Sequence, residues 1–392
     1  MKQATAISRW SIVLLGFVLP LSTAATNVLL ILLITAWSFS GNVMQSLKLL
    51  VTHPAARMFG VLFLLFVIGS LYSPVDPSAI SAMLNKMLKL LYFPVVLFFM
   101  QEEKWRKYTL WAFLSAMAVT VMMVSYQHVY CTPVKLVVGK VFKDRIYTGL
   151  MMAFASFVAA HLFSVSSNKT ARVLLASLAV VFSFYTLFMS SGRAGYGIFL
   201  VLASLFLIRQ RLIKKRLWVF GGLFIFLIAA LCCSTVLQNR IMQVWSDIVQ
   251  YQAGNVDTSV GARLSFFQHT FALSWQHPWF GSGTGSFATV YEIFANAHHL
   301  VTTDNPHNEY LNVFFQLGLV GLIALLGLFL TLYRELKTVL LPDRWLAEGL
   351  LAAMVIGCLA NSWLMDFTSG YFFIILMAVL FGSTFLPKKD LV

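Results

Sequence analysis

The sequence contains few charged residues. Asp, Glu, Lys and Arg together make up 11% of its 392 residues, whereas hydrophobic residues make up 59%. A soluble globular domain carries about 25% charged residues, so this composition excludes that class. Apolar runs close to the length of a bilayer span recur from Trp10 to Leu386. We therefore predict a single integral membrane domain over residues 1–392.

Motifs of metal, nucleotide and disulfide chemistry are missing too. No Asp-x-Asp or Glu-x-Asp pair occurs, and the adjacent His298 and His299 lack a Cys or carboxylate pattern around them. The four cysteines lie in or beside predicted spans without metal or disulfide spacing. There is no Gly-x-Ser-x-Gly elbow, phosphate-binding P-loop or Gly-x-Gly-x-x-Gly loop. We expect no metal and no cofactor.

The apolar runs predict an all-α protein with about twelve transmembrane helices. The predicted spans lie near 10–22, 24–40, 58–72, 84–100, 108–130, 146–164, 172–190, 196–208, 217–235, 309–333, 346–363 and 370–386. Pro20 and the small polar residues after it divide the first two. The N-terminus resembles a signal peptide, but a second apolar run follows at once, so an uncleaved first helix is expected.

The distribution of basic residues predicts the orientation. In a soluble protein the formal charge of +14 would suggest nucleic acid, but here its meaning depends on the side of the membrane. Nineteen of the 28 Lys and Arg residues fall on the N-terminal side of the predicted spans and nine fall opposite. By the positive-inside rule, both termini are predicted to be cytoplasmic.

One long connection, 236–308, lies on the outer side in this topology. Its segments 236–251 and 259–275 carry apolar residues at helical spacing, so we expect interfacial helices there. The turn-forming run from His277 to Gly285 ends the second segment.

The segment Asp304-Asn305-Pro306-His307-Asn308-Glu309-Tyr310-Leu311 opens the tenth span. Asn305 suits an N-cap and Pro306 the first helical position, which predicts His307 in the first turn beside the positive helix end. That environment favours a neutral imidazole, which suits a general base. The alternative is a structural, capping histidine.

The turn Ser190-Ser191-Gly192-Arg193-Ala194-Gly195 joins spans seven and eight. Glycine lets backbone N–H groups approach an anion, and arginine presents a charged fork to phosphate oxygens. Equally open is helix packing by glycine, with Arg193 extending to lipid headgroups.

Other basic residues lie on the same outer side. Arg263 is the lone charge of an otherwise apolar helix, and Arg145 ends a basic run with Lys140 and Lys143 just before span six. Lys86 and Lys89, spaced i, i+3, are predicted to share one helix face. Phosphate binding and extension to headgroups explain these residues equally well.

Together these motifs resemble the O-antigen ligase and polymerase superfamily. The resemblance rests on their order along the chain: Arg145, Ser191–Gly195, Gly261–Arg263, His277–Phe287 and Asn305–Leu311. It implies a polytopic, GT-C-like protein of the bacterial inner membrane with its active site facing the periplasm. Arg193 and Arg263 match the family's paired arginines, and His307 matches the histidine of its motif-bearing helix.

The resemblance further implies a metal-independent, inverting glycosyltransferase. The donor would be O antigen linked to undecaprenyl diphosphate, the acceptor a hydroxyl of lipid A-core, and the surroundings membrane lipids without nucleic acid. His307 would be the base, while Arg193, Arg263 and Arg145 would bind the diphosphate. Further candidate substrate contacts are Asn308, Lys86 and Lys89.

Three alternatives remain open at the level of the sequence. The related polymerase and a protein O-oligosaccharyltransferase share these motifs, because acceptor identity is not written in them. A transporter of lipid-linked glycan is a different class, for which charged residues along a pathway through the membrane would be expected.

Overall fold

The computed structural model describes residues 1–130, 141–190, 192–209, 234–254, 256 and 258–385, and every regular element in these ranges is helical. The first half contains α1 (Lys2–Val18), α2 (Thr23–Ser38), α3 (Val43–Thr52), α4 (Pro54–Gly69), α5 (Pro77–Met87), η1 (Leu88–Leu91), α6 (Tyr92–Phe99), α7 (Glu103–Tyr130), α8 (Arg145–Val165), α9 (Lys169–Phe184), η3 (Tyr185–Met189) and α10 (Arg193–Arg209). The second half contains α12 (Thr235–Gln252), α13 (Ser259–Ser274), α14 (Phe287–Ala297), α15 (Glu309–Glu335), η5 (Leu336–Thr338), α16 (Asp343–Gly357), α17 (Phe367–Phe381) and η6 (Gly382–Phe385).

A helix occupies eleven of the twelve predicted spans. The ninth, 217–235, falls almost entirely on residues outside the described ranges. Six of the described helical segments are long and apolar enough to cross a membrane, and a seventh is counted if the pair α2 and α3, bent by 101°, is one span. This agrees with a polytopic membrane protein, whereas twelve crossings stay a prediction. Helices such as α10 and α16, with 17 and 15 residues, are short for a hydrocarbon core of about 30 Å.

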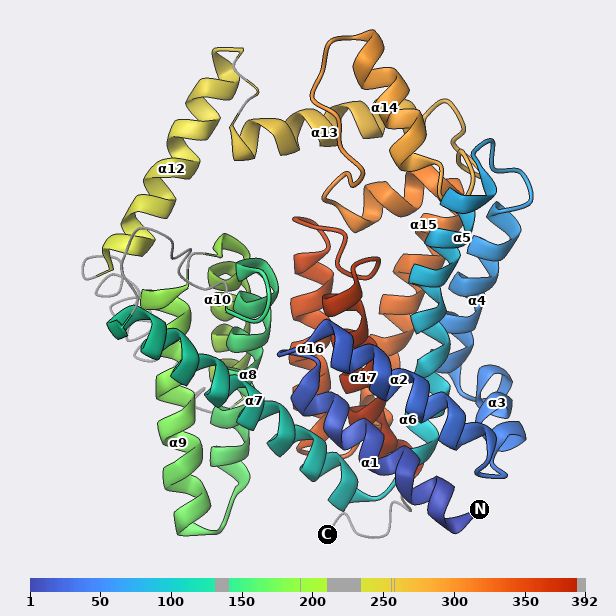
Figure 1. The fold of residues 1–392 in the computed structure, drawn as a ribbon. Coiled ribbons are helices and arrows are strands. Elements are labelled where there is room, and N and C mark those ends of the chain that lie inside the picture. The colour runs from blue at the N-terminus through green and yellow to red at the C-terminus, as the bar shows by residue number, and fades with distance from the viewer. Residues whose placement is uncertain (131–140, 191, 210–233, 255, 257, 386–392) are drawn as a thin grey trace.

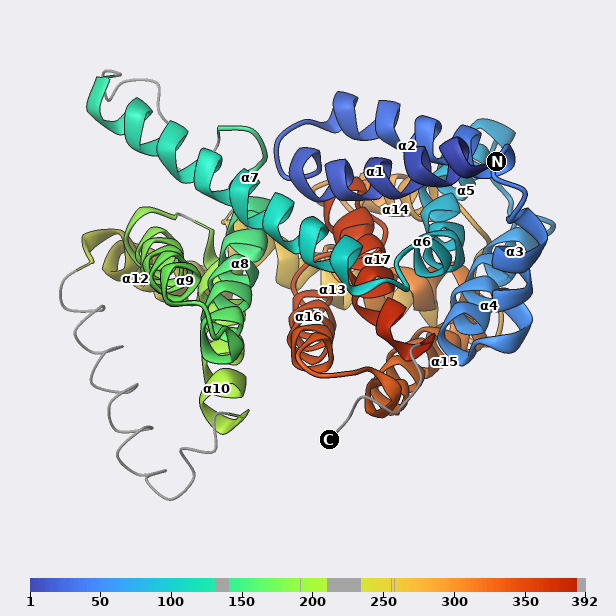
Figure 2. The same ribbon diagram turned by 90° about the horizontal axis from the view of Figure 1, so that it is seen from below.

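The helix α17 lies at the centre of the bundle (Figure 1). Its residues are apolar all round and almost all buried, as expected of a helix enclosed by others. It packs against α6 and α16, whereas α8, α9 and α10 form a second group that the long helix α7 approaches (Figure 2). The helices α12, α13 and α14 lie together at the end of the molecule opposite the N-terminus.

The two helices predicted inside the long connection are confirmed as α12 and α13. The sequence analysis missed α14, although its buried residues Phe287, Tyr291 and Ala295 recur at intervals of four. The predicted break between the first two helices is also confirmed, because Ser22 caps α2 by accepting a hydrogen bond from the backbone N–H of Ala25.

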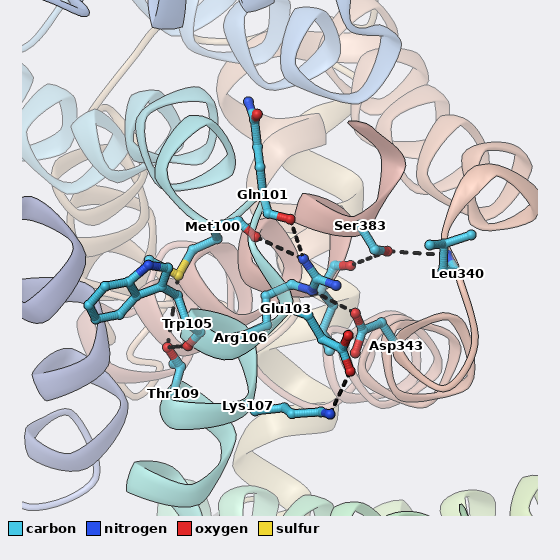
Figure 3. A network of polar contacts seen from close by, with 11 residues as sticks. Met100, Gln101, Glu103, Trp105, Arg106, Lys107, Thr109, Leu340, Asp343 and Ser383 are labelled. Carbon is cyan, nitrogen blue, oxygen red and sulfur yellow. Dashed lines mark hydrogen bonds and ion pairs between the residues drawn. The ribbon is translucent and has the colours of Figure 1, made fainter. Parts of the chain in front are cut away.

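A buried ion pair fixes the helix ends farthest from α13 (Figure 3). The Nε atom of Arg106 lies 2.7 Å from Oδ2 of Asp343, the first residue of α16. The same guanidinium donates to the carbonyl oxygens of Met100 and Gln101 at 3.2 and 2.6 Å. These contacts join the start of α7 to the start of α16, and therefore help to set where the far end of α16 lies.

Candidate active site

The three arginines of the predicted site line one cavity. It has a volume of about 120 Å³, equal to that of roughly four water molecules in the liquid. Arg145 comes from the start of α8, Arg193 from the start of α10 and Arg263 from the middle of α13. The remaining lining residues are Ile146, Gly192, Ala194, Gln243, Ser259, Ala360 and Asn361.

Glycines bring Arg145 and Arg193 together. A Cβ atom on Gly195 would lie 2.9 Å from the Cα atom of Gly149, so the absence of a side chain lets α10 approach α8 closely. A Cβ atom on Gly192 would lie 2.5 Å from the carbonyl oxygen of Arg145. These glycines therefore allow close helix packing, which was the alternative interpretation of the turn. Arg193 itself faces the cavity. Ser191 lies outside the described residues.

Positive charge is in excess at this cavity. Among the described residues, the only ion pair of the three arginines joins Arg193 to the buried Asp247 of α12, at 3.5 Å. Burial lowers the pKa of Arg263, and the nearby charges of Arg193 and Arg145 lower it further. Three guanidinium groups facing one carboxylate leave a site suited to an anion with more than one negative charge.

His307 precedes α15 instead of lying in its first turn, so that prediction is wrong. The N-cap is Asn308, whose side chain accepts a hydrogen bond from the backbone N–H of Leu311 at 3.0 Å. Asn305 instead accepts from the backbone N–H of His307, at 2.9 Å. His307 adopts a left-handed conformation with φ of 55°, which is uncommon outside glycine.

A hydrogen-bonded chain connects His307 to the turn between α16 and α17. The Nδ1 atom of His307 lies 2.9 Å from Oδ1 of Asn361, and Nδ2 of Asn361 lies 3.4 Å from Oδ2 of Asp366. The hydroxyl of Tyr147 donates to the same carboxylate oxygen at 2.8 Å. Because Asn361 turns its NH₂ group to Asp366, its oxygen accepts from His307 Nδ1–H, which leaves the lone pair on Nε2.

The helix α13 links His307 to the arginines. Phe266, one turn after Arg263, stacks on the imidazole with ring centroids 6.2 Å apart. His307 does not itself line the arginine cavity, but its partner Asn361 does. Thus Asn361 joins His307 directly to the cavity, while Phe266 joins it to the helix that carries Arg263.

The other predicted contacts are held in structural interactions. Lys89 is buried, and its Nζ atom donates to the carbonyl oxygens of Met365 and Asp366 at 2.5 and 2.7 Å. Lys86 is exposed, whereas Lys89 is enclosed by the protein, so a shared role of the two lysines in binding phosphate stays a prediction. The amide of Asn308 donates to the carbonyl oxygen of Leu359 in addition to capping α15. Lys89 and Asn308 thus bind backbone carbonyl groups near the site and do not line the arginine cavity.

Among the described residues of the basic run, only Arg145 lines the cavity. Lys143 turns away and donates a hydrogen bond to the hydroxyl of Thr23 on α2. Lys140 lies outside the described residues.

The glycine-rich run after His277 binds the backbone of α15 through hydrogen bonds. The α15 helix is interrupted at Gly318, where φ is 63°, and the carbonyl oxygens of Phe315 and Gln316 accept hydrogen bonds from Ser282 and Gly283. In return, the carbonyl oxygens of Pro278 and Trp279 accept from Leu319 and Val320. These four hydrogen bonds fasten the end of the α13 segment to α15.

Four residues of the site escaped the sequence analysis: Asp247, Asn361, Asp366 and Tyr147. Asn361 and Asp366 are polar residues at the break between two strongly apolar runs, which was a usable signal. Glu309 was visible inside the histidine motif, and its carboxylate accepts from the backbone N–H groups of Leu364 and Met365 at 2.8 and 3.0 Å. It holds the turn that carries Asn361.

Among the described residues, no three His, Cys, Asp or Glu side chains gather in a geometry that could hold a metal ion. His298 lies at the end of α14, where its Nδ1 atom is 2.9 Å from the carbonyl oxygen of Phe294. The two adjacent histidines thus lie exposed at the end of a helix.

Comparison with known proteins gives a match to the part of the chain that carries Arg193, Arg263 and His307. A family model described as O-antigen ligase matches residues 178–326, which include Arg193, Arg263 and His307. A Haemophilus influenzae protein, described as uncharacterized, is 26% identical over 259 residues. That similarity covers 62% of this chain and 63% of the relative, so less than two thirds of the relative's length is matched. The match over residues 178–326 thus confirms the resemblance to the O-antigen ligase and polymerase superfamily.

Proposed function

We propose that the chain transfers O-antigen glycan from undecaprenyl diphosphate to a sugar hydroxyl of lipid A-core. The observation that carries this proposal is the convergence of Arg145, Arg193 and Arg263 on a cavity that also holds Asn361, the partner of His307. The family match supports an O-antigen ligase-type enzyme.

In this proposal the arginines bind the donor's diphosphate. When the bond between the anomeric carbon and the phosphate oxygen breaks, the electron pair leaves with the diphosphate and negative charge grows on it. Fixed guanidinium groups stabilise that charge without reorganising during the reaction. Since arginine stays protonated and presents a planar fork, it suits this task better than lysine.

His307 then acts as the base. The acceptor hydroxyl oxygen attacks the anomeric carbon while its proton passes to Nε2 of His307. The imidazolium so formed is stabilised by the oxygen of Asn361 and, through that amide, by the Asp366 carboxylate. A single displacement of this kind inverts the anomeric centre.

The location of the charges favours a transferase over a transporter. The cavity lies where α8 and α10 begin and after α16 ends, at one end of the bundle. Lys89, a buried cation inside a candidate span, is occupied by two carbonyl oxygens and does not line this cavity. A transport pathway would carry charged groups through the membrane instead. With the topology predicted from the basic residues, the site faces the periplasm and both termini are cytoplasmic.

The test is glycan transfer in membranes of a strain that lacks its own ligase. The intact chain is compared with His307→Ala and Arg193→Ala, and with His298→Ala and Arg172→Ala as matched controls. Both control residues are exposed and lie outside the cavity. Expression of all five chains is equalised by immunoblot.

The expected result is attachment of long O-antigen chains to lipid A-core by the intact chain and both controls, and its loss in the two site variants. Lengthening of the carrier-linked glycan without attachment would assign the polymerase reaction instead. Glycan on a protein acceptor would assign the oligosaccharyltransferase. Full activity of His307→Ala would refute the proposed base.

A further inference from the structure

A second cavity, of about 290 Å³, lies at the opposite ends of α10 and α16, two helices that reach the arginine site. It is lined by Arg209, Tyr333, Arg334, Leu336, Lys337, Arg344 and Glu348. The helix α10 begins with Arg193 at the first cavity and ends with Arg209 at the second. Its 17 residues separate the two by about 26 Å, so the second cavity lies near the other membrane surface.

The second cavity carries positive charge without matching carboxylates. Glu348 is paired with Arg209, whose Nη2 atom lies 2.5 Å from Oε1 of the glutamate. Arg334, Lys337 and Arg344 form no ion pair with any residue that the structure describes. Three cations around a hollow form a site for an anion, whereas the general excess of basic residues on one membrane side would leave them dispersed.

An apolar stripe on α15 leads to this cavity. Ile323, Leu326 and Leu330 are exposed and recur at helical spacing, and the exposed Tyr333 continues the stripe. Arg334 and Lys337 follow on the same side of the chain, beyond the tyrosine. Tyrosine is enriched at the level of lipid headgroups. An apolar stripe, then an aromatic ring, then basic residues matches the order of tail, glycerol region and phosphate in a phospholipid.

We propose that this cavity binds the phosphate headgroup of an anionic phospholipid whose acyl chain lies along Ile323, Leu326 and Leu330. Basic hollows between membrane helices bind such headgroups through phosphate oxygens. The occupant is a lipid and not a free phosphate, because the cations adjoin an apolar stripe that is exposed in the described structure and that an acyl chain would cover. This site is independent of the glycan transfer proposed above, since it shares no residue with it.

The experiment measures lipid retention by native mass spectrometry of the purified full chain in detergent. The probes are dioleoyl phosphatidylglycerol and dioleoyl phosphatidylcholine, added singly. The test variant is R334Q/K337Q/R344Q. Its control is K2Q/K48Q/K169Q, which removes the same charge from exposed lysines outside the cavity.

The intact chain and the control are expected to retain phosphatidylglycerol, and the test variant to bind it about tenfold more weakly or worse. Equal weakening in both variants, or equal binding of phosphatidylcholine by the intact chain, would overturn the proposal. Displacement of the lipid by millimolar inorganic phosphate would reassign the cavity to free phosphate.

Two further measurements separate lost binding from lost folding. The single variant Lys337→Gln, at an exposed position, is expected to weaken phosphatidylglycerol binding about threefold or more while keeping the thermal unfolding profile of the intact chain. A phosphatidylglycerol with a photoreactive group in its acyl chain is expected to label α15 between Ile323 and Leu330. Labelling confined to other helices would place the lipid elsewhere and overturn the proposal.

Discussion

The Nδ1 atom of His307 and the Oδ1 atom of Asn361 lie 2.9 Å apart, although 54 positions separate the two residues in the chain. This contact orients the imidazole, and Asp366 in turn orients the amide. A base that is positioned by such a chain depends on every member of it.

Replacing Asn361 by Ala is expected to lower the rate of glycan transfer about 10- to 100-fold, because His307 loses the acceptor that fixes its Nδ1–H tautomer. The donor affinity should change little, since the arginines remain. The measurement is kcat and KM with purified donor and acceptor. A variant that raised KM alone would show that Asn361 contacts substrate instead of positioning the base.

The pH dependence of glycan transfer should show whether Asp366 positions His307 through Asn361 or only stabilises the fold. Burial raises the pKa of this carboxyl, so it takes up a proton at a higher pH than an exposed Asp would. As the pH falls through that raised pKa, the network loses its acceptor and transfer declines. In Asp366→Asn this titrating carboxyl is absent, so the acid limb that it produces should disappear from the kcat/KM profile while the plateau falls. A lower plateau with an unmoved limb would indicate structural support only.

Arg193 and Asp247 should have opposite effects on binding of inorganic pyrophosphate, used as a probe of the diphosphate site. Arg193→Gln removes a cation, and loss of one such donor at a reacting anion typically costs about 10²- to 10³-fold in kcat. Asp247→Asn removes the carboxylate that lies 3.5 Å from Arg193, so pyrophosphate should inhibit it more strongly. Inhibition constants measured in membranes provide the check. Weaker inhibition in both variants would contradict a diphosphate site here.

Transfer should be insensitive to chelation, because three fixed guanidinium groups supply the positive charge that a metal would otherwise bring. The rate in detergent is compared before and after EDTA treatment, with MgCl₂ added back in a third sample. A loss on chelation that Mg²⁺ restores would refute metal independence.

Two glycines near the start of α10, Gly195 and Gly197, should differ in their tolerance of substitution. Gly195→Ala places a methyl group 2.9 Å from the Cα atom of Gly149 and should separate α8 from α10, and with them Arg145 from Arg193. Nothing lies within 4 Å of a Cβ atom on Gly197, so Gly197→Ala should be neutral or gain about 0.5–1 kcal/mol of helix stability. Transfer activity and thermal unfolding of both variants decide it. Equal activity would mean that close helix contact does not set the arginine geometry.

The ion pair of Arg106 and Asp343 should matter for stability and not for chemistry. Arg106→Ala leaves a buried carboxylate without its partner, which typically costs about 3–5 kcal/mol, whereas replacing both residues by apolar ones should recover much of that loss. Thermal unfolding followed by size exclusion in detergent gives the comparison. A double variant as unstable as the single one would contradict this account.

The arginine convergence was predictable through the resemblance to the O-antigen ligase and polymerase superfamily, whereas the residues alone left phosphate binding and contact with lipid headgroups equally open. Helix bounds were also predictable, since apolar runs and caps such as Ser22 and Asp144 are local. The position of His307 was not, because Asn305 and Asn308 are equally good caps by type. Tertiary contacts with Ser362 and Leu359 decide between them.

Lys89 illustrates a second limit. Its spacing from Lys86 suggested a shared surface, but its ammonium group satisfies carbonyl oxygens 276 and 277 positions away. Burial of a lysine against backbone carbonyls depends on how α17 packs, which no local pattern encodes.

The interruption of α15 at Gly318 restricts how the cavity can admit a bulky lipid-linked sugar. Four backbone hydrogen bonds join 278–283 to 315–320, so the C-terminal end of α13 is anchored to α15. If α13 moves to open the cavity, it must therefore rotate about its C-terminal end. Arg263 would move with it, and the displacement would be greatest near Thr258 and smallest near Trp275. For the proposed lipid-linked substrate, entry would then be widest at the end of α13 that contacts α12.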